Sequence, residues 1–317
     1  IEGRLMRVKV IGAGSIGNHL SHAARQRGHS VVLCDIDPEA LRRTEQDIYP
    51  SRYGSWDERI ETYLSGNAPT GNFDLIVIGT PPDTHISLAL DAVSERPQAI
   101  LIEKPFSPPS LEGCQELVEK AKGNGVKLFV GYDHVLGKAT KAVEDWLAKD
   151  FIGDVQSIDV EFREFWGGIF AAHPWLEGPH DSYLGFTNRG GGALCEHSHA
   201  LNLWQHFARV AGCGEVSQVS ADMVFVDDGR VYYDSIAALQ LRTDKGLVGR
   251  VIQDVVSLPV RKRALIQGTN GAVEWICGWK AGFDAVIVTT NSHPPKIQEI
   301  AKTRPEDFIL EVTHLEE

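Results

Sequence analysis

A glycine pattern near the start of the chain restricts its fold more than any other feature. An apolar stretch at residues 7–11 leads into Gly12, Gly14 and Gly17, and a second apolar stretch ends at Asp35. In a strand-turn-helix unit, the first glycine allows a tight turn and the second lets the backbone approach a pyrophosphate. The third lets the helix pack closely on the strand, and the N-terminus of that helix faces the phosphates. The pattern therefore predicts a dinucleotide-binding turn.

The acidic residue at the end of the second apolar stretch indicates which dinucleotide binds. Asp35 lies 18 positions after Gly17, near the spacing of about 20 residues at which a carboxylate reaches the ribose hydroxyls. A 2′-phosphate beside Asp35 would bring two anions together, and Ile36 offers no cation, although Arg42 or Arg43 could come close. We therefore expect NAD to be preferred over NADP.

Strand-like and helix-like segments alternate over the first part of the chain. Strands are expected at 7–11, 30–35, 73–78, 98–103 and 126–131, and helices at 15–27, 38–47, 84–94 and 110–123. Such alternation is typical of a parallel sheet with crossover helices. The fold class expected is α/β, with an N-terminal doubly wound Rossmann-type sheet.

The pattern changes after about residue 150. Strands separated by short turns are expected at 154–165, 216–226, 234–242, 246–254, 260–267, 271–276 and 284–289, with one helix at about 194–210. This order predicts an α+β domain with a large, open, mostly antiparallel sheet. We place a dinucleotide-binding domain at 5–126 and a substrate-binding and oligomerisation domain at 127–317.

One long connection, at residues 166–192, is rich in glycine, aromatic and histidine residues. Because it is too long for a passive link, we expect it to be functional. The segment from Phe165 to Arg189 is expected to become ordered when substrate binds and to control specificity, since it offers ring surfaces and hydroxyl partners.

Composition excludes several classes of partner. A chain of 317 residues suits two domains, and its net charge of −12 without a Lys or Arg stripe argues against nucleic acid and anionic membranes. No apolar run approaches the ~20 residues that span a bilayer. Five scattered cysteines without a C-x-x-C pair indicate reduced thiols and a cytoplasmic protein. Residues 1–4 match a protease-cleavage linker, so Met6 is the expected native start.

A second group of candidate residues follows two of the expected strands. Thr80-Pro81 comes after the strand at 73–78, and Glu103-Lys104-Pro105 comes at the end of the strand at 98–103. Open α/β sheets bind their ligands at the carboxyl ends of the strands. There, the Lys104 ammonium could donate a proton to a carbonyl oxygen while hydride reaches the carbon. The alternative is an ordinary exposed cation.

A third group lies in the expected helix of the second domain. After the glycine triplet 190–192, Glu196, His199 and Asn202 follow at i, i+3 spacing, with His206 one turn further on. An acid, an imidazole and an amide on one helix face suit hydroxyl recognition and proton transfer. The alternative is a helix N-terminus with solvated histidines.

These motifs together resemble the Gfo/Idh/MocA oxidoreductase family. The resemblance extends over the chain from residue 7 and rests on the glycine pattern at 12–17, Thr80-Pro81, Glu103-Lys104-Pro105, the glycine triplet before His199, and residues 268–271. It implies a Rossmann domain, a second domain with a large open sheet, tightly held NAD or NADP, and oxidation or reduction of a sugar or cyclitol. Lys104 falls on the catalytic lysine of the family, and His199 on its catalytic or substrate-binding histidine.

The chain departs from the family pattern in two places. The family commonly has Asp where this chain has Glu196, and often Asp where it has Asn202. An Arg that often follows the sixth strand is missing, since residues 131–134 read Gly-Tyr-Asp-His. The first departure affects the expected hydroxyl contacts and proton relay.

The sequence thus predicts three sets of site residues. The expected catalytic residues are Lys104, His199 and Glu196. The expected cofactor-binding residues are Gly12, Gly14, Ser15, Ile16, Gly17, Asp35, Thr80, Pro81, His85, Glu103 and Lys104. The expected substrate-binding residues are Lys104, Tyr132, Trp175, Tyr183, His199 and Asn202.

No metal is expected at this site. Glu196-x-x-His199 and Glu311-x-x-His314 have the carboxylate-histidine spacing of di-iron helices, but two such matches are close to what chance gives. A di-iron site also needs a four-helix bundle.

The expected activity is NAD-dependent dehydrogenation, or the reverse reduction, at a secondary alcohol carbon of a sugar, sugar derivative or cyclitol. Two alternatives remain open: a redox-assisted glycosidase or epimerase that retains its NAD, and a sugar-sensing regulator of the same fold without catalysis. An exposed face on a large sheet favours a homodimer or homotetramer.

Overall fold

The computed structural model describes residues 5–171 and 176–317. Contacts divide the chain into two compact units. The first unit comprises Ile1–Asp133 with Arg304–Glu317, and the second comprises His134–Thr303. The expected domains at 5–126 and 127–317 differ from these units, because β6 completes the first sheet and the last helix returns to the first unit.

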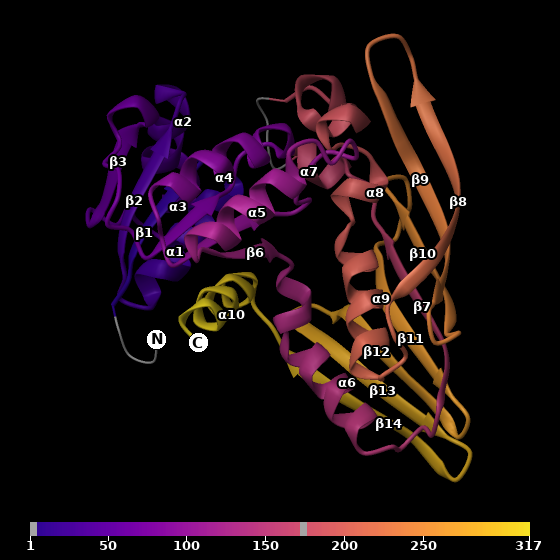
Figure 1. Cartoon of the computed structure of the whole chain (residues 1–317). Coiled ribbons are helices and arrows are strands. Elements are labelled where there is room, and N and C mark those ends of the chain that lie inside the picture. Colours follow the sequence, from indigo (N-terminus) through magenta and orange to yellow (C-terminus); the bar gives the residue numbers. More distant parts are fainter. Residues whose placement is uncertain (1–4, 172–175) are drawn as a thin grey trace. The chain divides into compact units, whose positions relative to one another are not determined.

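The first unit is built around a parallel sheet (Figure 1). Its strands are β1 (Arg7–Ile11), β2 (Ser30–Asp35), β3 (Ile60–Leu64), β4 (Leu75–Ile78), β5 (Ala99–Glu103) and β6 (Lys127–Gly131), in the order β3-β2-β1-β4-β5-β6. All neighbouring strands pair in parallel. The doubly wound Rossmann-type sheet is therefore confirmed.

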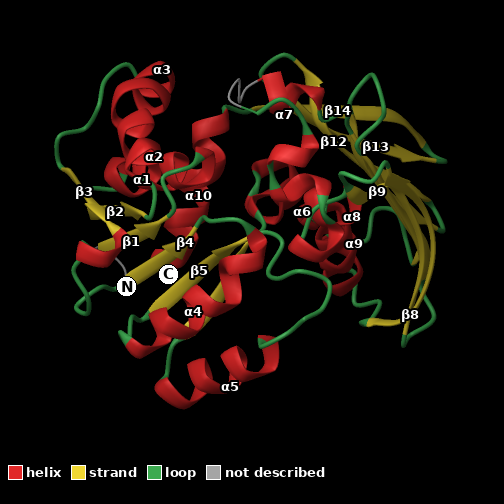
Figure 2. Ribbon diagram, turned by 90° about the horizontal axis from the view of Figure 1, so that it is seen from above, coloured by secondary structure: helices red, strands yellow, loops and turns green. Residues whose placement is uncertain are grey.

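Helices cover both faces of this sheet (Figure 2). They are α1 (Ser15–Gln26), α2 (Pro38–Arg43), α3 (Tyr49–Tyr53), α4 (His85–Ser94), α5 (Cys114–Asn124) and α10 (Arg304–Glu316), with a π-helical turn η1 (Thr44–Ile48) between α2 and α3. Because both faces are covered, every residue of β4 and β5 is buried, and these strands are continuous apolar runs. Strand β3, which the sequence analysis did not predict, is a partly exposed edge strand with a mixed polar pattern.

The last helix, α10, packs against α1. Its buried face includes Asp307, Phe308 and Glu311, and the Phe308 ring stacks on His19 with centroids 4.5 Å apart. Two carboxyl groups are thus buried along with the apolar face of this helix. Its place in the first unit could not be read from local sequence pattern, since nearly the whole second unit lies between α10 and β6.

The second unit contains an eight-stranded sheet. Its strands are β7 (Val155–Arg163), β8 (Val216–Asp227), β9 (Tyr232–Thr243), β10 (Val248–Asp254), β11 (Arg261–Gly268), β12 (Gly271–Lys280), β13 (Phe283–Thr290) and β14 (His293–Ala301), in the order β14-β13-β12-β11-β7-β10-β9-β8. The β7–β10 pair is parallel and the other pairs are antiparallel. The expectation of a mostly antiparallel sheet is confirmed, while β14 is an addition.

Helices of the second unit pack on one face of its sheet (Figure 1). They are α6 (Lys138–Ala148), α7 (Gly167–Ala171), α8 (Ala193–Glu196) and α9 (His199–Val210), and the long connection adds single turns η5 (Pro179–Asp181), η6 (Tyr183–Gly185) and η7 (Thr187–Arg189). Trp204 and Phe207 of α9 are fully buried against the sheet, and the Trp204 indole donates to the carbonyl of Ile158 at 2.7 Å. Helix α6 was not predicted from the sequence, and a single helix was expected where α8 and α9 lie.

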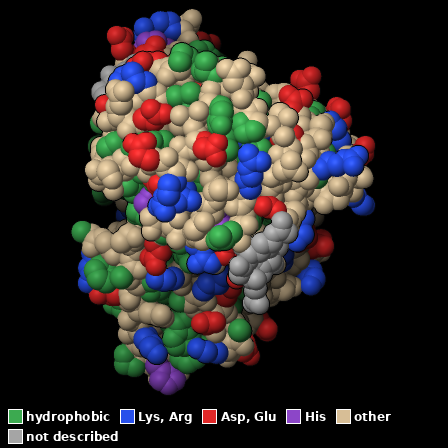
Figure 3. All heavy atoms as spheres, turned by 90° about the vertical axis from the view of Figure 1, so that its left-hand side faces the viewer, with side chains coloured by type: hydrophobic (Ala, Val, Ile, Leu, Met, Phe, Trp, Pro, Cys, Tyr) green, Lys and Arg blue, Asp and Glu red, His purple; other side chains and the backbone are tan. Residues whose placement is uncertain are grey.

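Charge is mixed over the surface seen in Figure 3, where basic and acidic side chains are interspersed. Among the described residues, no helix is both long and apolar enough to cross a membrane.

Candidate active site

The glycine turn after β1 is closed so tightly that two of its positions accept only glycine. Gly12 has a φ of +106°, and a Cβ placed on it would lie 2.8 Å from the carbonyl oxygen of Gly79. A Cβ on Gly17 would overlap the carbonyl oxygen of Gly12. Both glycines therefore hold α1 close to β1 and β4, as the sequence pattern predicts.

The remaining glycine of the turn faces open space. Gly14 is exposed at the N-cap of α1, where no side chain caps the helix, and a Cβ there would meet nothing within 4 Å. The helix then begins at the half-buried residues Ser15 and Ile16. An uncapped helix N-terminus beside an open glycine fits the pyrophosphate of a dinucleotide.

Asp35 closes the other side of the same turn. Its Oδ2 accepts a hydrogen bond from the backbone N–H of Ala13 at 2.7 Å, and its Oδ1 accepts from that of Asp37 at 2.9 Å. The carboxylate is thus fixed at the end of β2 beside the glycine turn. The next side chain, Ile36, is 86% exposed and offers an apolar surface beside the expected ribose position.

The two arginines that could have neutralised a 2′-phosphate are paired with carboxylates. Arg42 Nε donates to both oxygens of Glu39 at 2.9 Å. Arg43 Nη2 lies 3.4 Å from Asp37 Oδ2. These pairings favour NAD over NADP at this turn.

Residues after β4 and β5 are joined by a buried histidine. His85 is fully buried, with Nδ1 2.9 Å from the carbonyl oxygen of Pro105 and Nε2 2.8 Å from that of Thr80. Burial lowers the pKa of His85. Because both ring nitrogens face backbone carbonyls, His85 fixes the loops that carry Thr80-Pro81 and Lys104, and its expected contact with the cofactor stays a prediction.

Lys104 follows directly after the last residue of β5 and is half-buried. The preceding Glu103 is only 7% exposed and pairs with Gly131 in the β5–β6 register. A Cβ on Gly131 would lie 2.5 Å from Glu103 Oε1, so the missing side chain provides the space for this carboxyl. Lys104 therefore emerges at the carboxyl edge of the sheet beside a buried acid.

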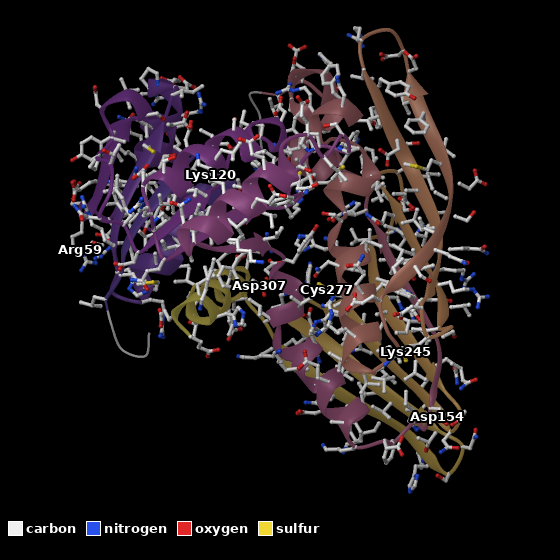
Figure 4. All side chains as sticks on the ribbon, in the orientation of Figure 1. Arg59, Lys120, Asp154, Lys245, Cys277 and Asp307 are labelled. Atoms are coloured by element: carbon white, nitrogen blue, oxygen red, sulfur yellow. The ribbon has the colours of Figure 1, made fainter. Side chains whose placement is uncertain are left out.

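Further buried carboxyl groups surround Glu103. Asp133, Asp307 and Glu311 are 6%, 5% and 3% exposed, and Figure 4 shows Asp307 on α10. Arg304 of the same helix lies 3.2 Å from Asp133 Oδ2 and 3.5 Å from Asp307 Oδ2. We call these four carboxyl groups the acid cluster.

Two members of the acid cluster, Glu103 and Glu311, have raised pKa values. Burial, followed by the charge of Asp133, raises the pKa of Glu103 to about 8, although the charge of Lys104 opposes the shift. Burial, followed by the charges of Glu103 and Asp133, also raises the pKa of Glu311. No local motif places these α10 residues beside Glu103, because only the tertiary fold brings them there.

In the second unit, a break in the helix separates two predicted catalytic residues. Glu196 is the last residue of α8 and His199 the first of α9. The carbonyl of Leu194, which a continuous helix would bond to Ser198, instead accepts from the Gln253 amide at 3.0 Å. The N–H of Ser198 bonds to Cys195 at 3.3 Å. The expected continuous helix at about 194–210 is therefore wrong, and Glu196 and His199 lie on two separate helices.

The glycine triplet before α8 is fixed by a buried acid that the sequence analysis did not identify. Gly192 has a φ of +88°, and a Cβ there would overlap the Asp234 carboxylate. Asp234 is 1% exposed and its Oδ2 accepts from the N–H of Leu194 at 2.7 Å. Burial raises the pKa of Asp234. This acid caps α8 from β9 and so positions Glu196.

His199 and Asn202 lie on the first turn of α9 and are half-buried. The His199 ring meets the His134 ring edge-on, with centroids 4.8 Å apart. Asn202 Oδ1 is buried and has no hydrogen-bond partner among the described residues, so it is available to a ligand hydroxyl. His206, further along α9, instead bonds Glu144 of α6 at 2.7 Å.

The remaining predicted substrate contacts lie on different elements. Tyr132 follows β6 and is half-buried, with its N–H bonded to the carbonyl of Val130 at 2.7 Å. Tyr183 begins η6 and packs beside the buried Trp166. Trp175 lies outside the described residues.

One surface group in the second unit has metal-ligand chemistry. Ligand atoms of Glu177, His180 and Asp181 lie within 4.8 Å of one another. Asp181 Oδ2 already accepts from the N–H of Glu177 at 2.7 Å, and its Oδ1 lies 3.4 Å from His180 Nε2. These internal contacts explain the arrangement, and we assign no metal to it.

Known structures share this fold. An oxidoreductase from Agrobacterium radiobacter, solved with NAD+, L-tartaric acid and magnesium, superposes with a TM-score of 0.75 at 20% identity, over 98% of this chain and 86% of that one. Levoglucosan dehydrogenase in complex with NADH and L-sorbose gives 0.75 at 18% identity, over 98% and 88%. An inositol dehydrogenase homolog from Azotobacter vinelandii, with NAD+, gives 0.70 at 17% identity, over 94% and 76%.

A curated relative matches a shorter stretch. The uncharacterized oxidoreductase YdgJ of Escherichia coli (strain K12) is 34% identical over 94 residues, which is 30% of this chain. The match spans about a quarter of that relative, 27% of its length.

Two sequence models of one family together span most of the chain. The oxidoreductase family model with an NAD-binding Rossmann fold matches residues 6–132, and the model of the C-terminal domain of the same family matches residues 140–274. The first match contains the glycine turn, Asp35 and Lys104, and the second contains His199. The chain belongs to the Gfo/Idh/MocA family of NAD-binding oxidoreductases.

Proposed function

We propose that this protein transfers a hydride between NAD and the secondary alcohol or ketone carbon of a sugar, a sugar derivative or a cyclitol. The observation that carries the proposal is the position of Lys104. Its half-buried side chain emerges at the same sheet edge as the glycine turn, beside an acid that keeps its proton at neutral pH. An ammonium at this edge is suited to proton exchange with a substrate oxygen.

In this proposal, the residues of the chain bind substrate and move the proton. The nicotinamide, when bound, accepts or supplies the hydride. In oxidation, the neutral amine of Lys104 takes the proton from the substrate hydroxyl and becomes the ammonium, and in reduction the ammonium returns it, while His199 and Glu196 assist. Asn202 Oδ1, buried without a partner among the described residues, accepts a hydrogen bond from a second hydroxyl. Tyr132, Tyr183 and Trp175 provide further substrate contacts.

The substrate class is supported by relatives and by the long connection in the second unit. Structural neighbours include a levoglucosan dehydrogenase complex with L-sorbose and an inositol dehydrogenase homolog. Between Phe165 and Arg189, the described residues form short helical turns that carry Tyr183 and His180. Phenol and imidazole groups suit the stacking and hydroxyl contacts that a sugar ring needs.

A panel of sugars, sugar acids and cyclitols with NAD tests this function through the absorbance of reduced nicotinamide. We expect sustained reduction with one or more polyhydroxy compounds, and none with simple primary alcohols. Product formation without net reduction of NAD would favour a redox-assisted epimerase or glycosidase. Sugar binding without conversion of any substrate would favour the regulator.

We also propose that copies of the chain associate through the open face of the large sheet. The face opposite α6 and α9 contains a hollow of about 820 Å³ lined by β7 to β12. Exposed apolar side chains on this face include Leu265 of β11 and Val248 of β10. Light scattering after size exclusion tests this: Leu265→Glu should give monomers, whereas Val118→Glu, on an exposed position of α5, should not.

A further inference from the structure

A cation that no motif predicts lies on the phosphate end of the glycine turn. Arg52, on the short helix α3, donates from Nη1 to the carbonyl oxygen of Ser15 at 2.8 Å and from Nη2 to its hydroxyl oxygen at 2.7 Å. Ser15 is the first residue of α1, directly after the open Gly14. The guanidinium is therefore held beside the helix N-terminus that fits a pyrophosphate.

The charge of Arg52 is not used by an acid of the protein. Among the described residues, no carboxylate lies within ion-pairing distance of it, whereas the nearby Arg42, Arg43 and Arg59 each pair with one. A guanidinium has five N–H donors, so the two bonds to Ser15 leave donors for an anion. Because the Ser15 hydroxyl oxygen accepts from Arg52, its hydrogen also remains available to a phosphate oxygen.

Helix α3 is anchored firmly enough to position this side chain. The Tyr53 hydroxyl lies 2.5 Å from His19 Nδ1, and its ring stacks on His22 with centroids 3.6 Å apart. The Tyr49 hydroxyl lies 3.1 Å from His22 Nδ1. These contacts attach both ends of α3 to α1, so Arg52 keeps its place against the glycine turn.

We infer that Arg52 is a cofactor-binding residue whose guanidinium, held by Ser15, contacts the diphosphate of the dinucleotide. The two N–H donors of Arg52 bonded to Ser15 set its orientation, and its charge adds to that of the helix N-terminus. A charge-assisted contact of this kind strengthens binding of the diphosphate but not of the uncharged adenosine part. The inference depends on the NAD site alone and needs no knowledge of the substrate.

Calorimetric titration of the full chain with NADH and with ADP-ribose tests the inference. We expect Arg52→Gln to bind both ligands about 10- to 100-fold more weakly, the usual range for losing a hydrogen bond to a charged group. Arg52→Lys should recover part of the loss, because it restores the charge without the paired donors. Arg59→Gln is the matched control, since Arg59 pairs with Asp57 near β3 (Figure 4). This variant should bind NADH and ADP-ribose with the affinity of the wild type.

Two further measurements separate a phosphate contact from a change in the turn. Adenosine, measured by competition with NADH, should bind Arg52→Gln as it binds the wild type, and thermal unfolding should verify that the variant is folded. Salt should weaken ADP-ribose binding more steeply in the wild type than in the variant. If the variant binds ADP-ribose within twofold of the wild type, or loses adenosine and ADP-ribose equally, Arg52 does not contact the phosphates.

Discussion

In the first unit, the two ends of the carboxyl edge of the sheet differ in their electrostatics. After β1 and β2, the chain presents glycine backbone, an uncapped helix N-terminus and one carboxylate, Asp35, held by backbone N–H groups. After β5 and β6, it buries the acid cluster around Glu103. The first end is prepared to receive an anion. At the second end, beside Lys104, burial and the charges of neighbouring carboxyl groups raise the pKa values of Glu103 and Glu311.

The comparison shows that main-chain atoms form the β1 end of this edge, whereas buried side chains form the β5 end. The glycine turn depends on close approach of main-chain atoms, so a single added methyl group disrupts it. The acid cluster depends on α10, which reaches the sheet from the far end of the chain. Substitutions at the β1 end should therefore change cofactor affinity, whereas substitutions at the β5 end should change kcat or the pH dependence of stability. The following predictions test that separation.

The largest expected effect is on catalysis at the β5 end. If Lys104 exchanges the proton, Lys104→Ala should lower kcat by roughly 10²- to 10⁴-fold, the range for losing a general acid or base. The dissociation constant for NADH should stay nearly unchanged, because the glycine turn and Asp35 hold the nucleotide. Lys120→Ala on α5 (Figure 4) is the control, since Lys120 donates hydrogen bonds to Leu90 and Ser94 of α4. Near-normal turnover of Lys104→Ala on an established substrate would make Lys104 a surface cation.

The next effect is steric and belongs to the β1 end. Gly17→Ala should weaken NADH binding by about 10-fold or more and destabilise the fold by about 1–3 kcal/mol, because the added Cβ overlaps the carbonyl of Gly12. Gly123→Ala in α5 is the matched control, since a Cβ there meets nothing within 4 Å. It should leave affinity unchanged and stabilise the helix slightly. Denaturant unfolding and NADH titration measure both changes, and equal behaviour of the two variants would contradict the tight turn.

A smaller effect concerns the choice of cofactor at Asp35. NAD should bind about 10-fold or more tightly than NADP, because the 2′-phosphate would meet the Asp35 carboxylate while Arg42 and Arg43 remain paired. Asp35→Ser should narrow this ratio by weakening NAD and improving NADP. Titration with both oxidised cofactors checks the ratio. Tighter binding of NADP to the wild type would reverse this assignment.

The smallest effect is a pH dependence of stability at the acid cluster. The raised pKa of Glu311 means that the folded chain keeps a proton that the unfolded chain releases. Its contribution therefore falls as pH rises from about 4.5 toward the folded pKa. His19, with a pKa lowered to about 3 chiefly by burial, has the opposite slope below about pH 6.5, so the comparison is made above that pH.

Glu311→Gln should thus raise the melting temperature at pH 8 more than at pH 6.5, because glutamine has no proton to release. Thermal unfolding across this range gives the measurement. Glu116→Gln, on an exposed position of α5, should shift the melting temperature equally at both pH values. A Glu311→Gln curve parallel to that of the wild type would show that the carboxyl is ionised in the folded protein.

Local sequence determined the parts of this protein that depend on neighbouring residues. The β1 turn, the buried strands β4 and β5 and the place of Lys104 follow from glycine spacing and apolar runs, because a covered parallel strand must be apolar throughout. The large sheet was also predicted, since short turns join its antiparallel strands. The edge strand β3 was not, because its half-exposed face lacks that pattern.

Only the tertiary structure decided the features that depend on contacts between residues far apart in the sequence. Gln253 takes the carbonyl of Leu194 and so breaks the helix between Glu196 and His199. The two ring nitrogens of His85 contact the backbone carbonyls of Pro105 and Thr80. Helix α10 brings Glu311 to the acid cluster and Arg52 reaches Ser15 from α3. A carboxyl or guanidinium gains its role from burial and from the charges around it, and neither quantity exists until the chain has folded.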